Sequence, residues 1–453
     1  MTVRYLVGDA RALLAEVPDG SVDLICTSPP YLSLRSYLPA DHPDKALELG
    51  SEATPAAFIS TLLELTAEFR RVLAPHGSIA IELGDTYAGS GGGGGDYLPG
   101  GLRDGQPGFT GSGRKATEQE IKDANAAHWR QKNQRSRDGR GLPDRPAESG
   151  RTVETWPLER CLTMVPELYR VALAYGIHPL TGEPSPAGRW RVRNVVVHGR
   201  PNPSVGALGD KYRPACSYWA VACVNRRWFD LDAVRTIPSV APSTYSGNGY
   251  TKNNPAGVGR VVLMPGNEAG APPLDWFEGE CDQFESDLWT IPTAPYKGAH
   301  YATFAPELVR RFVVSMCPQR VCEICGQPSK RISGEPTYLK ANGSEAAPQR
   351  WRSGIASGLG AHSLKPDGRF LRQAETIGWT DCGHNAMRPG LVLDPFAGSG
   401  TTGMVAAGNG REALLFDLDE RCRDLALGRI GLFLDEQDPG RLSVRATGRS
   451  GAQ

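Results

Sequence analysis

The chain has 453 residues, 40% of them hydrophobic, and fifty Lys plus Arg balance fifty Asp plus Glu, so the formal net charge is zero. Such a length can bury a substantial core and predicts about two or three domains, or one domain enlarged by insertions. Zero net charge excludes polyanion binding by overall charge, so such a contact must come from local patches. The ten cysteines are scattered, which is typical of reduced thiols with a single metal site.

The start of the chain, residues 1–8, lacks the basic and then apolar pattern of a signal peptide. No apolar run in the sequence is long enough to cross a bilayer. We therefore expect a cytoplasmic protein without a membrane partner.

The first residues predict a strand, a helix and a second strand. Val3 to Val7 reads as a short strand, and the turn after it carries the carboxylate of Asp9. Residues 10–17 have helical spacing, and residues 21–26 form an apolar strand that runs into Thr27-Ser28-Pro29-Pro30-Tyr31. Open parallel α/β sheets bind ligands at the carboxyl ends of their strands, so we expect chemistry at this motif.

The Ser28-Pro29-Pro30-Tyr31 motif suits a pocket for a flipped-out base. An exocyclic amino nitrogen of cytosine or adenine is a poor nucleophile, because its lone pair is delocalised into the ring. The Ser28 hydroxyl and the Pro29 carbonyl can accept its two hydrogens. The prolines keep the backbone rigid, and Tyr31 offers a face on which the base can stack. A proline-rich turn after a strand is the alternative interpretation, since such turns are common.

The middle of the sequence alternates between regular elements and segments without a core pattern. The predicted elements are a helix over 54–73, a strand over 78–83 that ends at Gly84-Asp85-Thr86, a helix over 165–174, and strands over 190–198 and 217–223. Glycine-rich and polar composition predicts flexible insertions over 89–150 and 236–279. The basic stretch 130–140 is either a solvated loop or a phosphate contact.

Near the C-terminus, the strand 391–393 enters Asp394-Pro395-Phe396-Ala397-Gly398-Ser399-Gly400-Thr401-Thr402-Gly403, and a helix should begin near Thr401. The glycines let the backbone pass close to a ligand, and the free N–H groups of the helix start favour a carboxylate. The next strand, 413–416, leads to Asp417, which can accept both hydroxyl protons of a ribose. A helix over 421–434 follows.

Three interpretations of this glycine turn compete. Gly398, Gly400, Gly403 and Asp417 match the dinucleotide fingerprint, which would serve NAD about as well as S-adenosylmethionine. A phosphate loop is excluded because no lysine follows the glycines. The Ser28 to Tyr31 motif favours S-adenosylmethionine, since a hydride-transfer enzyme has no evident need for it.

With its catalytic motif first and its cofactor motif last, the chain resembles the β-group amino-methyltransferases of DNA, which modify cytosine N4 or adenine N6. The resemblance covers residues 3–87, about 156–235 and 288–435. It implies an α/β fold, with a Rossmann-like class I methyltransferase sheet in permuted order. The catalytic residues would be Ser28, Pro29, Pro30 and Tyr31. The residues that bind S-adenosylmethionine would be Asp9, His300, Ala302, Phe304, Asp394, Pro395, Phe396, Gly398, Gly400, Thr401, Thr402 and Asp417. Arg193, Arg200 and Asn202 resemble a variable region that faces double-stranded DNA.

The cysteines add a candidate metal site. Cys322 and Cys325 form a C-x-x-C knuckle, and Cys382 and His384 can supply two further ligands of a structural zinc, which accepts Cys and His together in a tetrahedron. Cys317 is a competing ligand, and free thiols in a loop are the alternative.

These patterns divide the chain into a catalytic half (1–87), a Gly/Arg-rich insertion (88–155), a target-recognition region with a second insertion (156–287), a cofactor-closing segment (288–316), a zinc-knuckle insertion (317–390) and a cofactor-binding half with a tail (391–453). The expected function is transfer of a methyl group from S-adenosylmethionine to cytosine N4 in DNA, by a monomer or a homodimer. Adenine N6 is the runner-up target, because Ser at position 28 correlates only imperfectly with cytosine. An oxidoreductase or a non-catalytic DNA-binding protein is the alternative from another class.

Overall fold

The structure is a computed structural model, and it describes residues 2–34, 37–38, 41–88, 97–98, 102–103, 156–158, 161–199, 215–234, 288–290, 305–340 and 370–434. The statements below refer to these residues. The predicted site residues Arg200, Asn202, His300, Ala302 and Phe304 lie outside them, as do most of the two predicted insertions.

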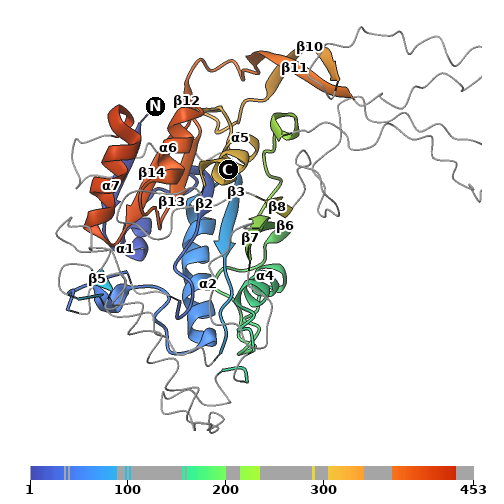
Figure 1. Cartoon of the computed structure of the whole chain (residues 1–453). Coiled ribbons are helices and arrows are strands. Elements are labelled where there is room, and N and C mark those ends of the chain that lie inside the picture. Colours follow the sequence, from blue (N-terminus) through green and yellow to red (C-terminus); the bar gives the residue numbers. More distant parts are fainter. Residues whose placement is uncertain are drawn as a thin grey trace, which may run out of the picture.

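A mixed sheet forms the centre of the molecule, in the order β1-β14-β13-β2-β3-β7-β6-β8 (Figure 1). Its strands are β1 (Val3–Val7), β14 (Glu412–Asp417), β13 (Leu391–Asp394), β2 (Val22–Thr27), β3 (Leu73–Leu83), β7 (Cys216–Cys223), β6 (Arg191–Gly199) and β8 (Leu288–Thr290). The first five are parallel, and β7 is antiparallel to both of its neighbours. The strands β13 and β14, encoded last, are inserted between β1 and β2, encoded first. The predicted permuted Rossmann-like fold is confirmed.

Three helices cover each face of the sheet. The helices α1 (Ala10–Glu16), α2 (Pro55–Val72) and α4 (Val165–Tyr175) pack on one face, and α5 (Pro306–Met316), α6 (Thr401–Gly408) and α7 (Glu420–Ile430) pack on the other. The apolar stripe predicted for 54–73 is buried in the first of these layers, with Phe58, Ile59 and Leu63 completely inaccessible. Within the described part of the chain, no helix has the length and apolar character needed to span a membrane.

The element boundaries follow local signals closely. Thr54 caps α2 by accepting from Ala57 N, and Pro55 occupies its first turn, as the sequence predicts. Two boundaries differ from expectation by more than one residue. β3 begins directly after α2 at Leu73 and includes the Pro75-His76-Gly77 turn. Its extra residues lie at the irregular register where Val22 pairs with Leu73 and Leu24 pairs with Ser78. α7 ends at Ile430 rather than Leu434, since Gly431 adopts a φ of 59° and only a short 3-10 turn, Gly431–Phe433, follows.

Several elements had no sequence signal that we recognised. They are β8, the helix α5, the pair β4 (Tyr97–Leu98) and β5 (Leu102–Arg103), the pair β9 (Arg320–Cys322) and β12 (Met387–Pro389), the hairpin of β10 (Arg331–Lys340) and β11 (Phe370–Trp379), and two further 3-10 turns, Lys45–Leu47 and Leu231–Val234. In Figure 1 this hairpin extends away from the central sheet, beyond β12. The domain boundaries drawn from the sequence stay predictions.

Candidate active site

The motif Ser28-Pro29-Pro30-Tyr31, which we call the acceptor motif, lies where the strand order reverses. From β13 the chain passes through α6 to β14 on one side, while β2 leads through α2 to β3 on the other. Ser28 to Tyr31 follow the carboxyl end of β2, and the glycine turn follows the carboxyl end of β13, its neighbour. Parallel α/β sheets bind ligands at such a switch point. The two predicted motifs are therefore adjacent.

Tyr31 is held against the end of β3. A Cβ atom added at Gly84 would lie 2.4 Å from Tyr31 Cε2 and 2.7 Å from Cδ2, so the ring rests directly on this glycine. The Tyr31 hydroxyl is 3.5 Å from Ser28 Oγ. Only a residue without a side chain at position 84 leaves room for this ring position. Gly84 is thus a site residue that sequence reasoning missed, although its place at the end of the neighbouring strand could have indicated it.

The glycines of the second motif have different structural reasons. Gly398 and Gly400 adopt positive φ values of 50° and 77°, which glycine adopts readily. A Cβ at Gly400 would also lie 2.9 Å from Ala426 and Ile430 in α7, and one at Gly403 would lie 2.6 Å from Leu415. Gly400 and Gly403 therefore allow α6 to pack closely against α7 and the sheet.

A buried carboxylate connects the two motifs. Asp394 is completely buried, accepts 2.6 Å hydrogen bonds from Thr27 Oγ1 and Thr402 Oγ1, and accepts a 3.1 Å bond from the backbone N–H of Phe396. Burial raises the pKa of Asp394 to about 6, although these three donors oppose the shift. Thr27 is the residue directly before Ser28. The Asp394 carboxyl group therefore fixes the glycine turn to the end of β2.

Asp417 connects the glycine turn to the next strand. Its carboxylate accepts 2.7 Å and 2.9 Å bonds from the backbone N–H groups of Gly398 and Asp419. Each carboxylate oxygen keeps a further lone pair for a hydroxyl. Burial raises the pKa of Asp417 to about 6. The Tyr5 hydroxyl holds the same turn from the other side by donating to the Gly398 carbonyl at 2.7 Å.

The remaining described residues of the predicted cofactor site surround this turn. Asp9 follows β1, which pairs with β14 at Val7 and Asp417, and it caps α1 while forming a 3.3 Å ion pair with Arg11. Pro395 is buried, Phe396 is half-buried, and no side chain caps the first turn of α6. The Thr401 hydroxyl accepts from Arg429 Nη1 at 2.8 Å.

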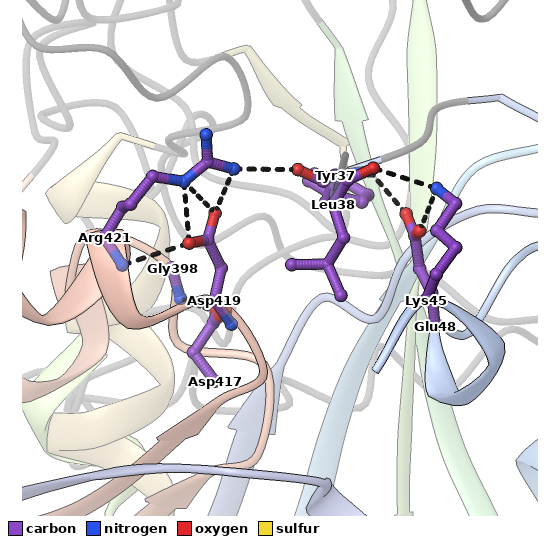
Figure 2. Close-up of polar contacts among 8 residues, drawn as sticks. All are labelled: Tyr37, Leu38, Lys45, Glu48, Gly398, Asp417, Asp419 and Arg421. Carbon is purple, nitrogen blue, oxygen red and sulfur yellow. Dashed lines mark hydrogen bonds and ion pairs between the residues drawn. The ribbon is translucent and has the colours of Figure 1, made fainter. Parts of the chain in front are cut away.

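A second connection joins Tyr37 and Leu38 to α7 on one side and to residues 45–48 on the other (Figure 2). The Tyr37 carbonyl accepts a 3.0 Å bond from Arg421 Nη2 of α7, and Arg421 also forms a 2.7 Å ion pair with Asp419. On the other side, Lys45 Nζ donates to the Leu38 carbonyl at 3.0 Å, and the N–H of Tyr37 donates to Glu48. Residues 37–38, which we call the strap, are thus held between α7 and residues 45–48.

The predicted DNA contact Arg193 lies away from this edge. It is exposed on β6, at the irregularity between Val192 and Asn194, where β6 is level with Ala222 of β7 and hence with Ile79 of β3. Ile79 pairs with Ile25 of β2, three residues before Ser28, and β3 and β7 lie between β2 and β6 in the sheet. The structure therefore does not bring Arg193 together with Ser28 and Tyr31.

The predicted metal ligands do come together, at the amino-terminal edge of the sheet. The ligand atoms of Cys322, Cys325, Cys382 and His384 all lie within 4.8 Å of one another. The backbone N–H of Cys325 lowers the pKa of the Cys322 thiol to about 6. The competing ligand Cys317 is not part of this cluster, because its sulfur lies against Gly390, where an added Cβ would be 2.8 Å away.

Comparison with known proteins finds similarity to DNA methyltransferases. A family model described as DNA methylase matches residues 22–148 and 386–427. Type II methyltransferase M.XycI of Xanthomonas campestris pv. cyanopsidis is 38% identical over 80 residues, which are 18% of this chain and 25% of that protein. M.SmaI of Serratia marcescens is 21% identical over 94% of this chain and 90% of its own length. A solved PvuII DNA methyltransferase, named as cytosine-N4-specific, matches 97% of this chain and 88% of its own at 12% identity, with a TM-score of 0.41.

The local matches cover no more than 25% of the length of the first three curated relatives. The two segments matched by the family model contain the acceptor motif and the glycine turn. The resemblance predicted from the sequence is confirmed: the chain is related to the amino-methyltransferases of DNA.

Proposed function

We propose that this protein transfers a methyl group from S-adenosylmethionine to the exocyclic amino group of a base flipped out of duplex DNA, with cytosine N4 as the target. The observation that carries the proposal is the Thr27–Asp394–Thr402 connection, which joins the acceptor motif to the glycine turn through hydrogen bonds of 2.6 Å. Both halves of a transfer site are thereby held side by side. The matching family model is described as DNA methylase and the matching relative is a Type II methyltransferase, which adds support to the proposed methyl transfer.

The acceptor residues would orient the amine. The Ser28 hydroxyl and the Pro29 carbonyl accept its two hydrogens, which directs the nitrogen lone pair at the methyl donor. Tyr31, fixed in place by Gly84, stacks against the base. As the nitrogen–carbon bond forms and the carbon–sulfur bond breaks, the amine releases one proton to solvent.

The donor residues fit an amino-acid nucleoside. Asp417 has lone pairs left for the two ribose hydroxyls, and the start of α6 favours a carboxylate. The methyl group of S-adenosylmethionine is already activated by the positive sulfur, so the contribution of the protein is positioning and charge arrangement. Asp394 and Asp417 place two carboxyl groups close to where the positively charged ligand would bind.

The cytosine assignment rests on Ser28, because a serine at this position resembles the cytosine-N4 members of the class. Nucleoside analysis of DNA incubated with the protein and S-adenosylmethionine should show N4-methylcytosine. N6-methyladenine would replace the cytosine assignment and keep the reaction. Neither product, or no binding of S-adenosylmethionine, would reject the proposal in favour of another nucleotide-binding function. Sequencing that detects modified bases, on DNA from cells that express the chain, would also give the sequence context.

A matched pair of variants tests the role of Tyr31. Tyr31→Phe keeps the ring and removes only the hydroxyl that lies 3.5 Å from Ser28, so it should retain most of the turnover. Tyr31→Ala removes the stacking surface and should lose about tenfold or more, since base stacking contributes about 1–3 kcal/mol. Both should bind S-adenosylmethionine like the wild type. Equal turnover in the two variants would reject the stacking role.

A further inference from the structure

The Cys322, Cys325, Cys382 and His384 side chains form a cluster that the transfer reaction does not use. Cys322 ends β9, Cys325 follows in the turn, and the other two lie between the hairpin strand β11 and the strand β12. Residues far apart in the sequence thus meet at one point, at the base of the β10–β11 hairpin.

The spacing of the ligand atoms fits one tetrahedral ion. Zn–S bonds of about 2.3 Å and Zn–N bonds of about 2.0 Å imply edges of about 3.8 Å between two sulfurs and about 3.5 Å between sulfur and nitrogen. In the structure, Cys325 Sγ and Cys382 Sγ are 3.7 Å apart. His384 Nδ1 is 3.5 Å from Cys322 Sγ and 3.3 Å from Cys382 Sγ. A disulfide would need sulfurs about 2 Å apart.

The backbone around the cluster is shaped for a metal knuckle. The N–H of Cys325 points at Cys322 Sγ at 3.5 Å, and Gly326 adopts a φ of 69° while its N–H donates to the Cys322 carbonyl at 3.0 Å. On the other side, Gly383 has a φ of 84°. These turns direct three sulfurs and one ring nitrogen inward, although Cys325 and His384 are otherwise exposed to solvent.

We propose that these four residues bind a structural zinc ion that fixes the β10–β11 hairpin to the amino-terminal edge of the sheet. Side-chain contacts also attach the hairpin base to the rest of the fold. Arg388 of β12 pairs with Asp23 at 2.6 Å, Trp228 Nε1 donates to the Ser329 carbonyl at 2.9 Å, and Arg331 pairs with Asp230 at 2.9 Å. The ion would join Cys322 and Cys325, before the hairpin, to Cys382 and His384, after it, and would add to the β9–β12 and β10–β11 pairings.

The position of the cluster makes the ion structural. Asp23 lies near the amino end of β2, and Ser28 follows its carboxyl end. Five residues of strand span about 16 Å at about 3.3 Å each. The cluster and the acceptor motif therefore lie at opposite ends of the parallel strands. Removal of the ion should therefore leave the binding of S-adenosylmethionine unchanged.

Metal analysis of the full chain, purified under reducing conditions and dialysed against zinc, tests the proposal. One zinc per chain is expected in the wild type and almost none in a Cys325→Ser, Cys382→Ser double variant. Cys161→Ser, at an exposed cysteine outside the cluster, should keep the full content. Cobalt in place of zinc should give the visible absorption of a tetrahedral thiolate site. Wild-type protein that takes up no zinc or cobalt, or a double variant with full content, overturns the site.

Hydrogen exchange tests the structural role. Without the ion, amide exchange should rise over residues 320–334 and 375–389 and stay unchanged in β1, β2 and β14. If exchange is unaffected near the hairpin, or if it rises equally throughout the sheet, the ion does not fix the hairpin and the proposed role is wrong.

Discussion

The two edges of the central sheet each contain a completely buried aspartate, and the two carboxyl groups have opposite partners. At the amino edge, Asp23 is paired with Arg388 at 2.6 Å and with His76 at 2.9 Å. Burial alone would raise the pKa of Asp23, but these two side chains outweigh it and hold the pKa at about 2. At the carboxyl edge, Asp394 has only neutral donors, and burial raises its pKa to about 6.

The two edges therefore differ in how the charge of the buried aspartate is balanced. The amino edge has its own cation, Arg388, so the charge of Asp23 is balanced within the protein. At the carboxyl edge, burial raises the pKa values of Asp394 and Asp417 to about 6, and the hydrogen-bond donors described above for these two carboxyl groups are neutral. A positively charged ligand would favour the ionised forms of both groups. The same residue type is therefore charge-paired at one edge and, in the proposed function, lies close to a cationic ligand at the other.

The largest effect is expected at the amino edge. Asp23→Asn leaves the buried Arg388 guanidinium without its counterion, so the free energy of unfolding at neutral pH should fall by about 3–5 kcal/mol. Glu307→Gln breaks an exposed pair with Arg310 and should cost less than about 1 kcal/mol. Urea denaturation of both variants measures the difference. Similar losses would remove the distinction between the buried pair and a surface pair.

Asp394→Asn tests the carboxyl edge through pH. The wild-type carboxyl has a folded pKa above its unfolded value, so its stabilising contribution is complete below about pH 4 and is lost as pH rises through about 6. The variant does not titrate. Its free energy of unfolding, relative to the wild type, should therefore rise by on the order of 2–3 kcal/mol between about pH 4 and pH 7. A difference that stays constant over this range contradicts the raised pKa.

The contribution of Asp23 to stability should have the opposite pH dependence. Its folded pKa is lowered, so its contribution is present above the unfolded value and is lost as pH falls toward about 2. A stability curve of the Asp394→Asn variant, which retains Asp23, should still fall on acidification. The two aspartates thus have separable pH signatures in one protein.

Gly84→Ala separates activity from stability at the carboxyl edge. The new Cβ would lie 2.4 Å from the Tyr31 ring and should displace it, at a cost of about 1–3 kcal/mol. Methyl transfer should fall about tenfold or more, while binding of S-adenosylmethionine is retained. Gly428→Ala in α7, where a Cβ meets nothing within 4 Å, is the matched control and should be neutral or slightly stabilising. Normal turnover of Gly84→Ala would show that the ring position is not needed.

The smallest effect is expected at the strap. Arg421→Ala removes the 3.0 Å bond to the Tyr37 carbonyl and should weaken binding of S-adenosylmethionine by several-fold, or up to about 1 kcal/mol. Arg310→Ala is a fair comparison, because both arginines are 46% exposed and pair with a nearby carboxylate. Calorimetric titration would compare them. Equal affinities would mean that the strap plays no part in holding the ligand.

Much of the fold was predictable from local patterns. The strand 3–7 was predicted with its observed bounds, and Thr54 with Pro55 marked the start of α2, because caps and apolar periodicity act within a few residues. The hairpin β10–β11 and the strand β8 were not predicted, because their sequences show no clear apolar alternation. The metal ligands were predicted from the C-x-x-C spacing, but the exclusion of Cys317 depended on where its sulfur lies in the folded chain, against Gly390.

The sequence by itself determined the types of local structure and the chemistry that each motif can offer: acceptors at Ser28 and Pro29, a glycine turn at Gly398 and Gly400, and three thiols with one imidazole. Only the tertiary structure decided which of these groups meet. Thr27 and Asp394 become neighbours because β13 is inserted beside β2. Whether a buried aspartate titrates near 2 or near 6 depends on partners hundreds of residues away, since desolvation and charge pairing are properties of the folded environment.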